Sequence, residues 1–197
     1  MLLSGFPRVS LAHLPTRLEF LPRLTEQLGG PEIWVKRDDC TGLATGGNKT
    51  RKLEFSMGEA LERGADTIIT VGAVQSNHVR QTAAAACKLG LRCDVLLEHR
   101  VRNPGELYLN SGNVLLDRVF GANLREFEKG TDFDAAMEDV AGEVRAAGGT
   151  PYLIPGEDGL AYIEALRERG VRVVILTNSL ATNNHIPVHG AYQRYRK

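Results

Sequence analysis

A lysine beside a glycine pair is the residue of this sequence best suited to covalent chemistry. Lys49 follows Gly46, Gly47 and Asn48, and a short apolar strand is predicted over residues 33–36 just before this turn. A lysine amine confined by the surrounding backbone can lose its proton and form a Schiff base with an aldehyde. Lys49 is therefore the first candidate catalytic residue, and an aldehyde cofactor would suit it.

A second group of polar residues stands where a predicted strand, residues 67–71, gives way to a predicted helix, residues 76–89. Gln75, Ser76 and Asn77 occupy this junction, and Gly90 ends the helix. In open α/β sheets, ligands bind beyond the carboxyl ends of the strands, where helix N-termini present free N–H groups. The junction suits a carboxylate or a phosphate, although Ser76 could also serve only as the cap of its helix.

Strands and helices alternate in the segment that would position these residues. Short apolar runs predict strands, and amphipathic runs predict helices. The predicted strands are 67–71, 93–97, 123–127 and 152–154, and the predicted helices are 76–89, 113–120 and 132–147. This alternation predicts an α/β fold with an open parallel sheet and flanking helices, whose βαβ part covers about residues 55–150. A helix over 160–169 and a strand over 171–176 are expected in the remaining tail.

The composition excludes several classes of partner. The 197 residues carry 24 basic and 24 acidic side chains, so the net charge is zero and gives no bulk attraction to nucleic acid or anionic membrane. No signal peptide or membrane span is recognisable, which favours a cytoplasmic protein with small-molecule partners. The three cysteines fit neither a metal site nor a disulfide framework, and Cys87, in an alanine-rich run, is expected in the core.

A phosphate-binding P-loop is the competing interpretation of the lysine segment. Residues 42–50 approach the pattern G-x-x-x-x-G-K-[ST], but Asn48 separates the second glycine from Lys49. One extra residue turns the lysine away from the phosphate nest. No apolar run ending in aspartate supplies a Walker B strand, and no G-x-G-x-x-G is present. The sequence therefore disfavours a nucleotide hydrolase.

Both polar segments resemble one family of pyridoxal-phosphate enzymes. Residues 35–52 and residues 71–81 are similar to the two hallmarks of the D-cysteine desulfhydrase and 1-aminocyclopropane-1-carboxylate deaminase family, which also includes L-cysteate sulfo-lyase. The resemblance covers about residues 5–155, with the hallmarks in the expected order and separation. It implies a tryptophan-synthase-β-like fold of type II, pyridoxal 5'-phosphate as cofactor, a small amino-acid substrate and a homodimer.

The resemblance also assigns roles to individual residues. Lys49 would hold the cofactor as a Schiff base and act as the catalytic base, and Ser76 would face the substrate. Asn77 and Lys52 would lie beside the cofactor, and Gln75, Ser76 and Asn77 would bind the substrate carboxylate. The implied reaction is a β-elimination on a cysteine-like amino acid that releases sulfide or sulfite, pyruvate and ammonia. Three neighbouring residues are expected to be structural or at the surface: Arg51, His78 and Arg80.

The resemblance ends near residue 155, so the type II fold is expected to be incomplete at its C-terminus. Residues 156–197 form an atypical α/β tail, and residues 154–197 resemble part of a phospholipase-D-like protein such as a cardiolipin synthase. The H-x-K-x-x-x-x-D motif of that chemistry is absent. The segment 177–179 is a poor substitute for the family's phosphate loop. The sequence leaves open a deaminase, a non-catalytic α/β binding protein, and a fusion, frameshift or truncation as the origin of the tail.

Overall fold

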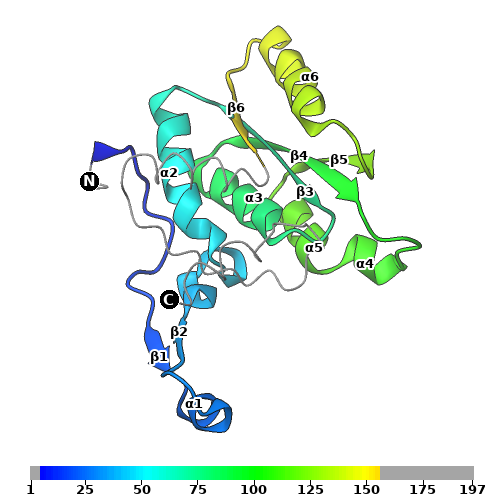
Figure 1. Cartoon of the computed structure of the whole chain (residues 1–197). Coiled ribbons are helices and arrows are strands. Elements are labelled where there is room, and N and C mark those ends of the chain that lie inside the picture. The colour runs from blue at the N-terminus through cyan, green and yellow to red at the C-terminus, as the bar shows by residue number, and fades with distance from the viewer. Residues whose placement is uncertain (1–4, 156–197) are drawn as a thin grey trace, which may run out of the picture. The chain divides into compact units, whose positions relative to one another are not determined.

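A four-stranded parallel sheet forms the centre of the described structure. The computed structural model describes residues 5–155, which lie within one compact unit, Met1–Gly156. The strands follow the order β5-β4-β3-β6, and all three neighbouring pairs are parallel (Figure 1). In chain order they are β3 (Thr67–Ala73), β4 (Arg92–His99), β5 (Asn123–Glu128) and β6 (Pro151–Ile154). The predicted α/β class with an open parallel sheet is confirmed.

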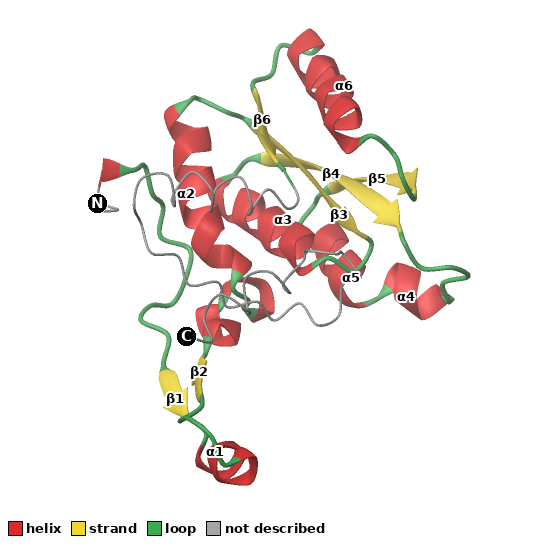
Figure 2. Cartoon of the chain, viewed as in Figure 1, coloured by secondary structure: helices red, strands yellow, loops and turns green. Residues whose placement is uncertain are grey.

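Helices cover both faces of this sheet (Figure 2). They are α2 (Lys49–Glu62), α3 (Asn77–Leu89) and α5 (Gly112–Val119) on one face, and α6 (Phe133–Ala146) on the other. Successive strand residues point to opposite faces, so Ile68 packs into the cluster containing Leu53 and Val79, whereas Ile69 packs with Met137. Because both faces are buried, the central strands are continuous apolar runs.

The helix boundaries follow the local signals that predicted them. Ser76 is the N-cap of α3 and accepts a hydrogen bond from the Val79 N–H, while Gly90 ends the helix with a left-handed φ of 73°. Capping therefore sets both ends of α3, as predicted. The short helix α4 (Glu106–Asn110) was not predicted. None of the described helices is long and apolar enough to cross a membrane.

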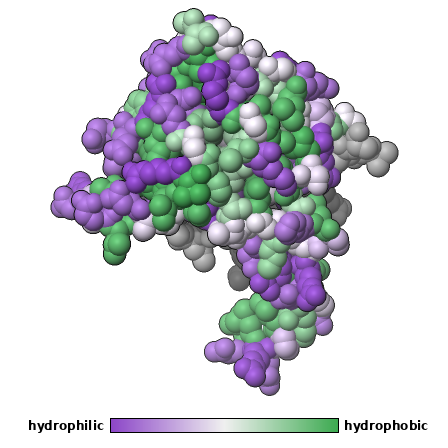
Figure 3. Space-filling model, turned by 180° about the vertical axis from the view of Figure 1, so that it is seen from behind, coloured by the Kyte–Doolittle hydropathy of each residue, from purple (hydrophilic) through white to green (hydrophobic). Residues whose placement is uncertain are grey.

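An N-terminal arm precedes the sheet. It consists of β1 (Leu18–Phe20), α1 (Pro22–Leu28) and β2 (Trp34–Lys36), and β1 and β2 pair antiparallel. The sequence predicted only β2, because three-residue strands carry little pattern. The rings of Phe20 and Trp34 pack with centroids 5.1 Å apart, yet both side chains stay largely exposed. Seen from behind, apolar residues gather on this arm (Figure 3).

Cys87 corrects one expectation about the core. It lies on α3 directly after the buried run 83–86, but its side chain is exposed, and Cys93 on β4 is the buried cysteine. The helical period explains the difference, since the residue after a buried alanine run can rotate onto the solvent face.

The predictions for the C-terminal tail lie outside the described residues. They are the boundary between residues 155 and 156, the helix over 160–169, the strand over 171–176, the segment 177–179 and the phospholipase-D-like resemblance. They stay predictions.

Candidate active site

The turn before Lys49 has an unusual backbone. Four consecutive residues have positive φ angles: Ala44 at 47°, Thr45 at 70°, Gly46 at 81° and Gly47 at 140°. Side chains with a Cβ rarely adopt this region, and a β-branched residue such as Thr45 is strained there. The chain then enters α2 at Lys49, two residues beyond this turn. The candidate lysine therefore begins a helix directly after a strained turn.

Close approach explains why two of these residues are glycines. A Cβ on Gly46 would lie 1.8 Å from the carbonyl oxygen of Asp39, and one on Gly47 would lie 2.5 Å from the side-chain nitrogen of Gln81. Asp39 belongs to the short 3-10 helix η2 (Asp38–Thr41), which leads through η3 (Leu43–Thr45) into the turn. Neither glycine can gain a side chain without moving its surroundings.

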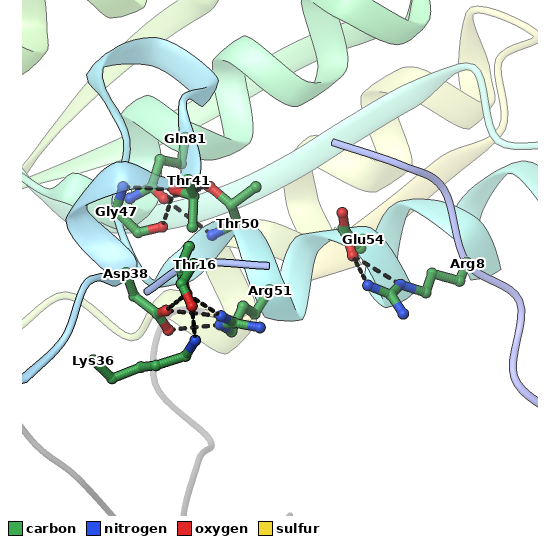
Figure 4. A network of polar contacts seen from close by, with 10 residues as sticks. All are labelled: Arg8, Thr16, Lys36, Asp38, Thr41, Gly47, Thr50, Arg51, Glu54 and Gln81. Carbon is green, nitrogen blue, oxygen red and sulfur yellow. Dashed lines mark hydrogen bonds and ion pairs between the residues drawn. The ribbon is translucent and has the colours of Figure 1, made fainter. Parts of the chain in front are cut away.

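Two buried polar side chains hold the end of this turn (Figure 4). Thr41 Oγ1 donates to the carbonyl of Gly47 (2.8 Å) and accepts from its N–H (2.9 Å). Gln81 Oε1, from α3, accepts from both the N–H (3.0 Å) and the hydroxyl (2.8 Å) of Thr50. Gln81 and Thr50 are fully buried. The residue after Lys49 is therefore tied to the helix that begins at the Ser76 junction.

Arg80 holds the turn from the same helix. Its guanidinium donates to Thr45 Oγ1 (2.8 Å) and to the carbonyl of Gly46 (2.8 Å), and the residue is only 9% exposed. Of the two roles expected for Arg80, at the surface or in packing, the structure shows packing. Asp117 on α5 lies close enough for its charge to interact with Arg80, and burial raises the pKa of Asp117 to about 7 against this attraction. Both Asp117 carboxylate oxygens lack a hydrogen-bond partner among the described residues.

A second network fixes the outer side of α2. Arg51 donates to Asp38 (2.6 Å) and to Thr16 Oγ1 (2.8 Å), and this ion pair lowers the pKa of Asp38 (Figure 4). One turn later, Glu54 is nearly fully buried and pairs with Arg8. The packing role expected for Arg51 is confirmed, and α2 is anchored on both of its sides.

The Ser76 junction is held by a different set of contacts. The side chain of Gln75 donates to the carbonyls of Tyr108 (2.5 Å) and Ser111 (2.9 Å) and accepts from the N–H of Asn113 (2.9 Å). The Asn113 amide in turn donates to the Gln75 carbonyl (2.8 Å) and to Asn77 Oδ1 (3.1 Å). The Gln75 side chain is therefore hydrogen-bonded to the connection between α4 and α5. Its role as a substrate ligand stays a prediction.

His78 is a buried structural residue. Its Nε2 lies 3.0 Å from Thr70 Oγ1, whose own proton goes to the carbonyl of Ile154, so Nε2 acts as the donor in this contact. Burial first, and then the charges of Lys52 and Lys49, lower the pKa of His78 to about 3. The neutral ring therefore links α3 to β3 and β6. The influence of both lysines also shows that they lie near the start of α3.

The structure brings the predicted site residues to one edge of the sheet. Lys49 and Ser76 are partly buried, Asn77 and Lys52 are exposed, and all four lie at the N-terminal ends of α2 and α3. Sequence reasoning missed the residues that hold them: Thr41, Arg80, Gln81, Asn113 and Asp117. Two of these could have been found from the sequence, because Arg80 and Gln81 are the last residues of the second hallmark segment. The other three lie outside both hallmark segments or carry no pattern that links them to the site.

An amine, a hydroxyl and side-chain amides gathered at the carboxyl ends of parallel strands define a class of protein. It is an α/β protein whose polar side chains lie beyond the carboxyl ends of the strands, where open α/β sheets bind their ligands. Residues 9–183 match the family described as "Pyridoxal-phosphate dependent enzyme", and the chain belongs to that family. The match runs to residue 183, past residue 155, where the resemblance to the family was expected to end.

Individual relatives show which members of the family the chain is similar to. D-cysteine desulfhydrases of Salmonella paratyphi B and Salmonella newport are each 50% identical over 171 residues, which cover 84% of this chain and 52% of theirs. The chain thus spans about half the length of these relatives. A solved structure of an ACC deaminase homologue is 38% identical with a TM-score of 0.70, over 88% of this chain and 53% of that one. The resemblance to the desulfhydrase and deaminase family, with its type II fold, is confirmed.

A more distant structure shares the fold alone. Escherichia coli diaminopropionate ammonia lyase is 19% identical with a TM-score of 0.52, and the alignment covers 81% of this chain and 48% of that one.

The described residues fit the reactive end of pyridoxal phosphate. Lys49 offers an amine, Ser76 a hydroxyl, and Asn77 an exposed amide whose oxygen accepts from Asn113. The first N–H groups of α3 add donors for an anion. Within residues 5–155, no cluster of histidine, cysteine, aspartate and glutamate is arranged to hold a metal ion. The donor set therefore matches an aldehyde cofactor and an amino-acid carboxylate.

Proposed function

We propose that this chain carries the lysine half of a pyridoxal-phosphate-dependent lyase that eliminates the β-substituent of a cysteine-like amino acid. D-cysteine, with release of sulfide, pyruvate and ammonia, is the first candidate substrate, because the relatives at 50% identity are D-cysteine desulfhydrases. L-cysteate, with release of sulfite, is the second. The observation that carries the proposal is the placement of Lys49 beside the start of α3, where Thr50 is bonded to Gln81.

The chain's own residues divide the work. When bound, pyridoxal phosphate supplies an aldehyde that condenses with amines and a ring that withdraws electrons from the substrate Cα. Lys49 Nζ would hold the cofactor and would accept the proton from the substrate Cα. Ser76 Oγ and the first N–H groups of α3 would orient the substrate carboxylate. Asn77 Nδ2 and Lys52 Nζ would bind the cofactor.

Covalent attachment tests the proposal directly. The full chain is incubated with pyridoxal phosphate, reduced with borohydride and digested, and the modified peptide is identified by mass spectrometry. The label should fall on Lys49 and disappear in Lys49→Ala, whereas Lys88→Ala, which changes an exposed lysine at the other end of α3, should label normally. Labelling spread over several exposed lysines, or labelling that survives Lys49→Ala, would refute the proposed cofactor site.

A deaminase is the second candidate, favoured by the 38% identity to the ACC deaminase homologue. Sulfide release from D-cysteine, sulfite release from L-cysteate and ammonia release from 1-aminocyclopropane-1-carboxylate separate the three activities. A chain that labels at Lys49 but turns over none of these substrates would instead support a non-catalytic binding protein. A homodimer and a cytoplasmic location stay predictions.

A further inference from the structure

The turn over residues 44–47, before Lys49, has an unfavourable backbone conformation that depends on contacts from elsewhere in the chain. A run of four positive φ angles is unfavourable for its two non-glycine members, Ala44 and Thr45. The Gly46 N–H bonds to the carbonyl of Leu43, the residue before the turn (3.0 Å). Strained backbone persists where surrounding contacts over-determine it, so the contacts from outside the turn decide its shape.

Arg80 supplies the contacts at the strained centre of the turn. One guanidinium nitrogen binds the Thr45 hydroxyl and another binds the Gly46 carbonyl, each at 2.8 Å. A guanidinium presents its donors in a fixed planar fork, so it fixes direction as well as distance. A lysine ammonium lacks this fork, so it would not reproduce both contacts in the same geometry.

The position of Arg80 along α3 makes these contacts relevant to the site. Arg80 lies one helical turn after Ser76, and its backbone N–H bonds to the Ser76 carbonyl (3.2 Å). The same residue therefore touches the substrate-facing junction through its backbone and the lysine turn through its side chain. Asp117 of α5 lies close enough for its charge to act on Arg80, although burial raises the pKa of Asp117 to about 7.

We propose that Arg80 is a positioning residue that sets the place of Lys49 relative to the Ser76 junction by clamping Thr45 and Gly46. As a statement about catalysis this rests on the proposed function, whereas the clamp itself does not. The Arg80 guanidinium bonds the Thr45 hydroxyl and the Gly46 carbonyl. It acts through the backbone of the turn, and loss of the fork should let Lys49 drift from the reacting atoms.

Hydrogen exchange of the full chain without cofactor tests the clamp. Arg80→Lys should speed exchange of the amides in residues 44–50 about tenfold, the effect of losing one buried hydrogen bond. Arg125→Lys is the matched control, because Arg125 is a partly buried arginine on β5 that bonds Asp94 and pairs with Glu143. Its effect should stay at β4, β5 and α6. Unchanged exchange in 44–50, or an equal rise there in both variants, would overturn the proposal.

A second pair of variants tests the clamp even if Arg80→Lys does not fold. Thr45 is exposed, so its substitution should leave the core intact. Thr45→Ala removes one acceptor of the fork and should speed exchange in residues 44–50, while Thr45→Ser keeps the hydroxyl and should restore the wild-type rate. Equal exchange in the two variants would count against the clamp.

Kinetics of the loaded enzyme then separate positioning from general stability. Arg80→Lys should lower kcat about tenfold or more and leave KM for D-cysteine within about threefold, because the substrate junction is untouched. A rise in KM with unchanged kcat would contradict the positioning role. If the wild-type chain does not label at Lys49, the proposed function fails, and the exchange experiment alone decides whether the clamp exists.

Discussion

Two segments reach the candidate site, and they are built in opposite ways. The turn over residues 44–47 is held by Arg80, whose bonds span 34 and 35 residues of sequence. The junction over residues 72–77 starts α3 through local bonds. The Ser76 N–H bonds to the carbonyl of Ala73, and the Ser76 hydroxyl accepts from the Val79 N–H, each three residues away. The lysine side of the site therefore depends on tertiary contacts, whereas the substrate side begins with local capping.

The largest difference is expected when each segment's glycine gains a methyl group. Gly46→Ala places a Cβ 1.8 Å from a backbone oxygen at a φ of 81°, while the Cβ of Gly72→Ala would meet only side-chain atoms of Ser76 and Val79. Gly46→Ala should lower the free energy of unfolding by about 4–5 kcal/mol, and Gly72→Ala by about 1–2 kcal/mol. Urea denaturation measures both unfolding free energies. Equal decreases in the two variants would contradict the difference between the two segments.

Buried titratable groups give the two segments opposite pH responses. Burial raises the pKa of Asp117, beside Arg80, from 3.8 to about 7. A raised pKa means that the unfolded chain releases this proton first, so stability is present below pH 3.8 and is lost as the pH rises to about 7. His78, beside Ser76, has its pKa lowered from 6.5 to about 3. Its contribution is present above pH 6.5 and is lost as the pH falls towards 3.

Asp117→Asn should therefore gain stability relative to the wild type as the pH rises. Between pH 4 and pH 8 the difference in unfolding free energy should shift in favour of the variant by up to about 4 kcal/mol. Urea titrations at several pH values measure this shift. Asp132→Asn, at an exposed helix cap, is the control for the substitution itself. A flat difference for Asp117→Asn would show that its carboxyl is not desolvated.

The same contrast explains what the sequence could predict. The apolar runs that form the central strands, the Ser76 cap and the Gly90 stop are local signals, and the structure confirms them. Lys49 was identified from its neighbours, yet nothing local shows that Arg80 reaches back to Thr45 or that Gln81 reaches Thr50. Such bonds depend on how α2 and α3 pack, which only the folded chain determines. The three-residue strands of the arm were too short to show a period.

The substrate side should show a smaller effect when one of its distant contacts, the Asn113 side chain, is removed. Asn113→Ala removes the two side-chain bonds to Gln75 and Asn77 and should lower the unfolding free energy by about 2 kcal/mol. KM for D-cysteine should rise while labelling of Lys49 stays unchanged, because the lysine turn has other anchors. Asn123→Ala, which removes a bond to Asp94 far from this junction, is the matched control. Reduced labelling in Asn113→Ala would show that the two segments are not independent.

The smallest stability effect belongs to Ser76, where two roles coincide. As a cap its bond is long (3.4 Å), so Ser76→Ala should lower the unfolding free energy by only about 0.5–1 kcal/mol. Asp132→Ala, at the N-cap of α6, should lose a similar amount without affecting turnover. Ser76→Asp separates the roles, because aspartate is a good cap but repels a substrate carboxylate. It should therefore restore stability and still impair turnover of D-cysteine, whereas recovery of both would make Ser76 a helix cap alone.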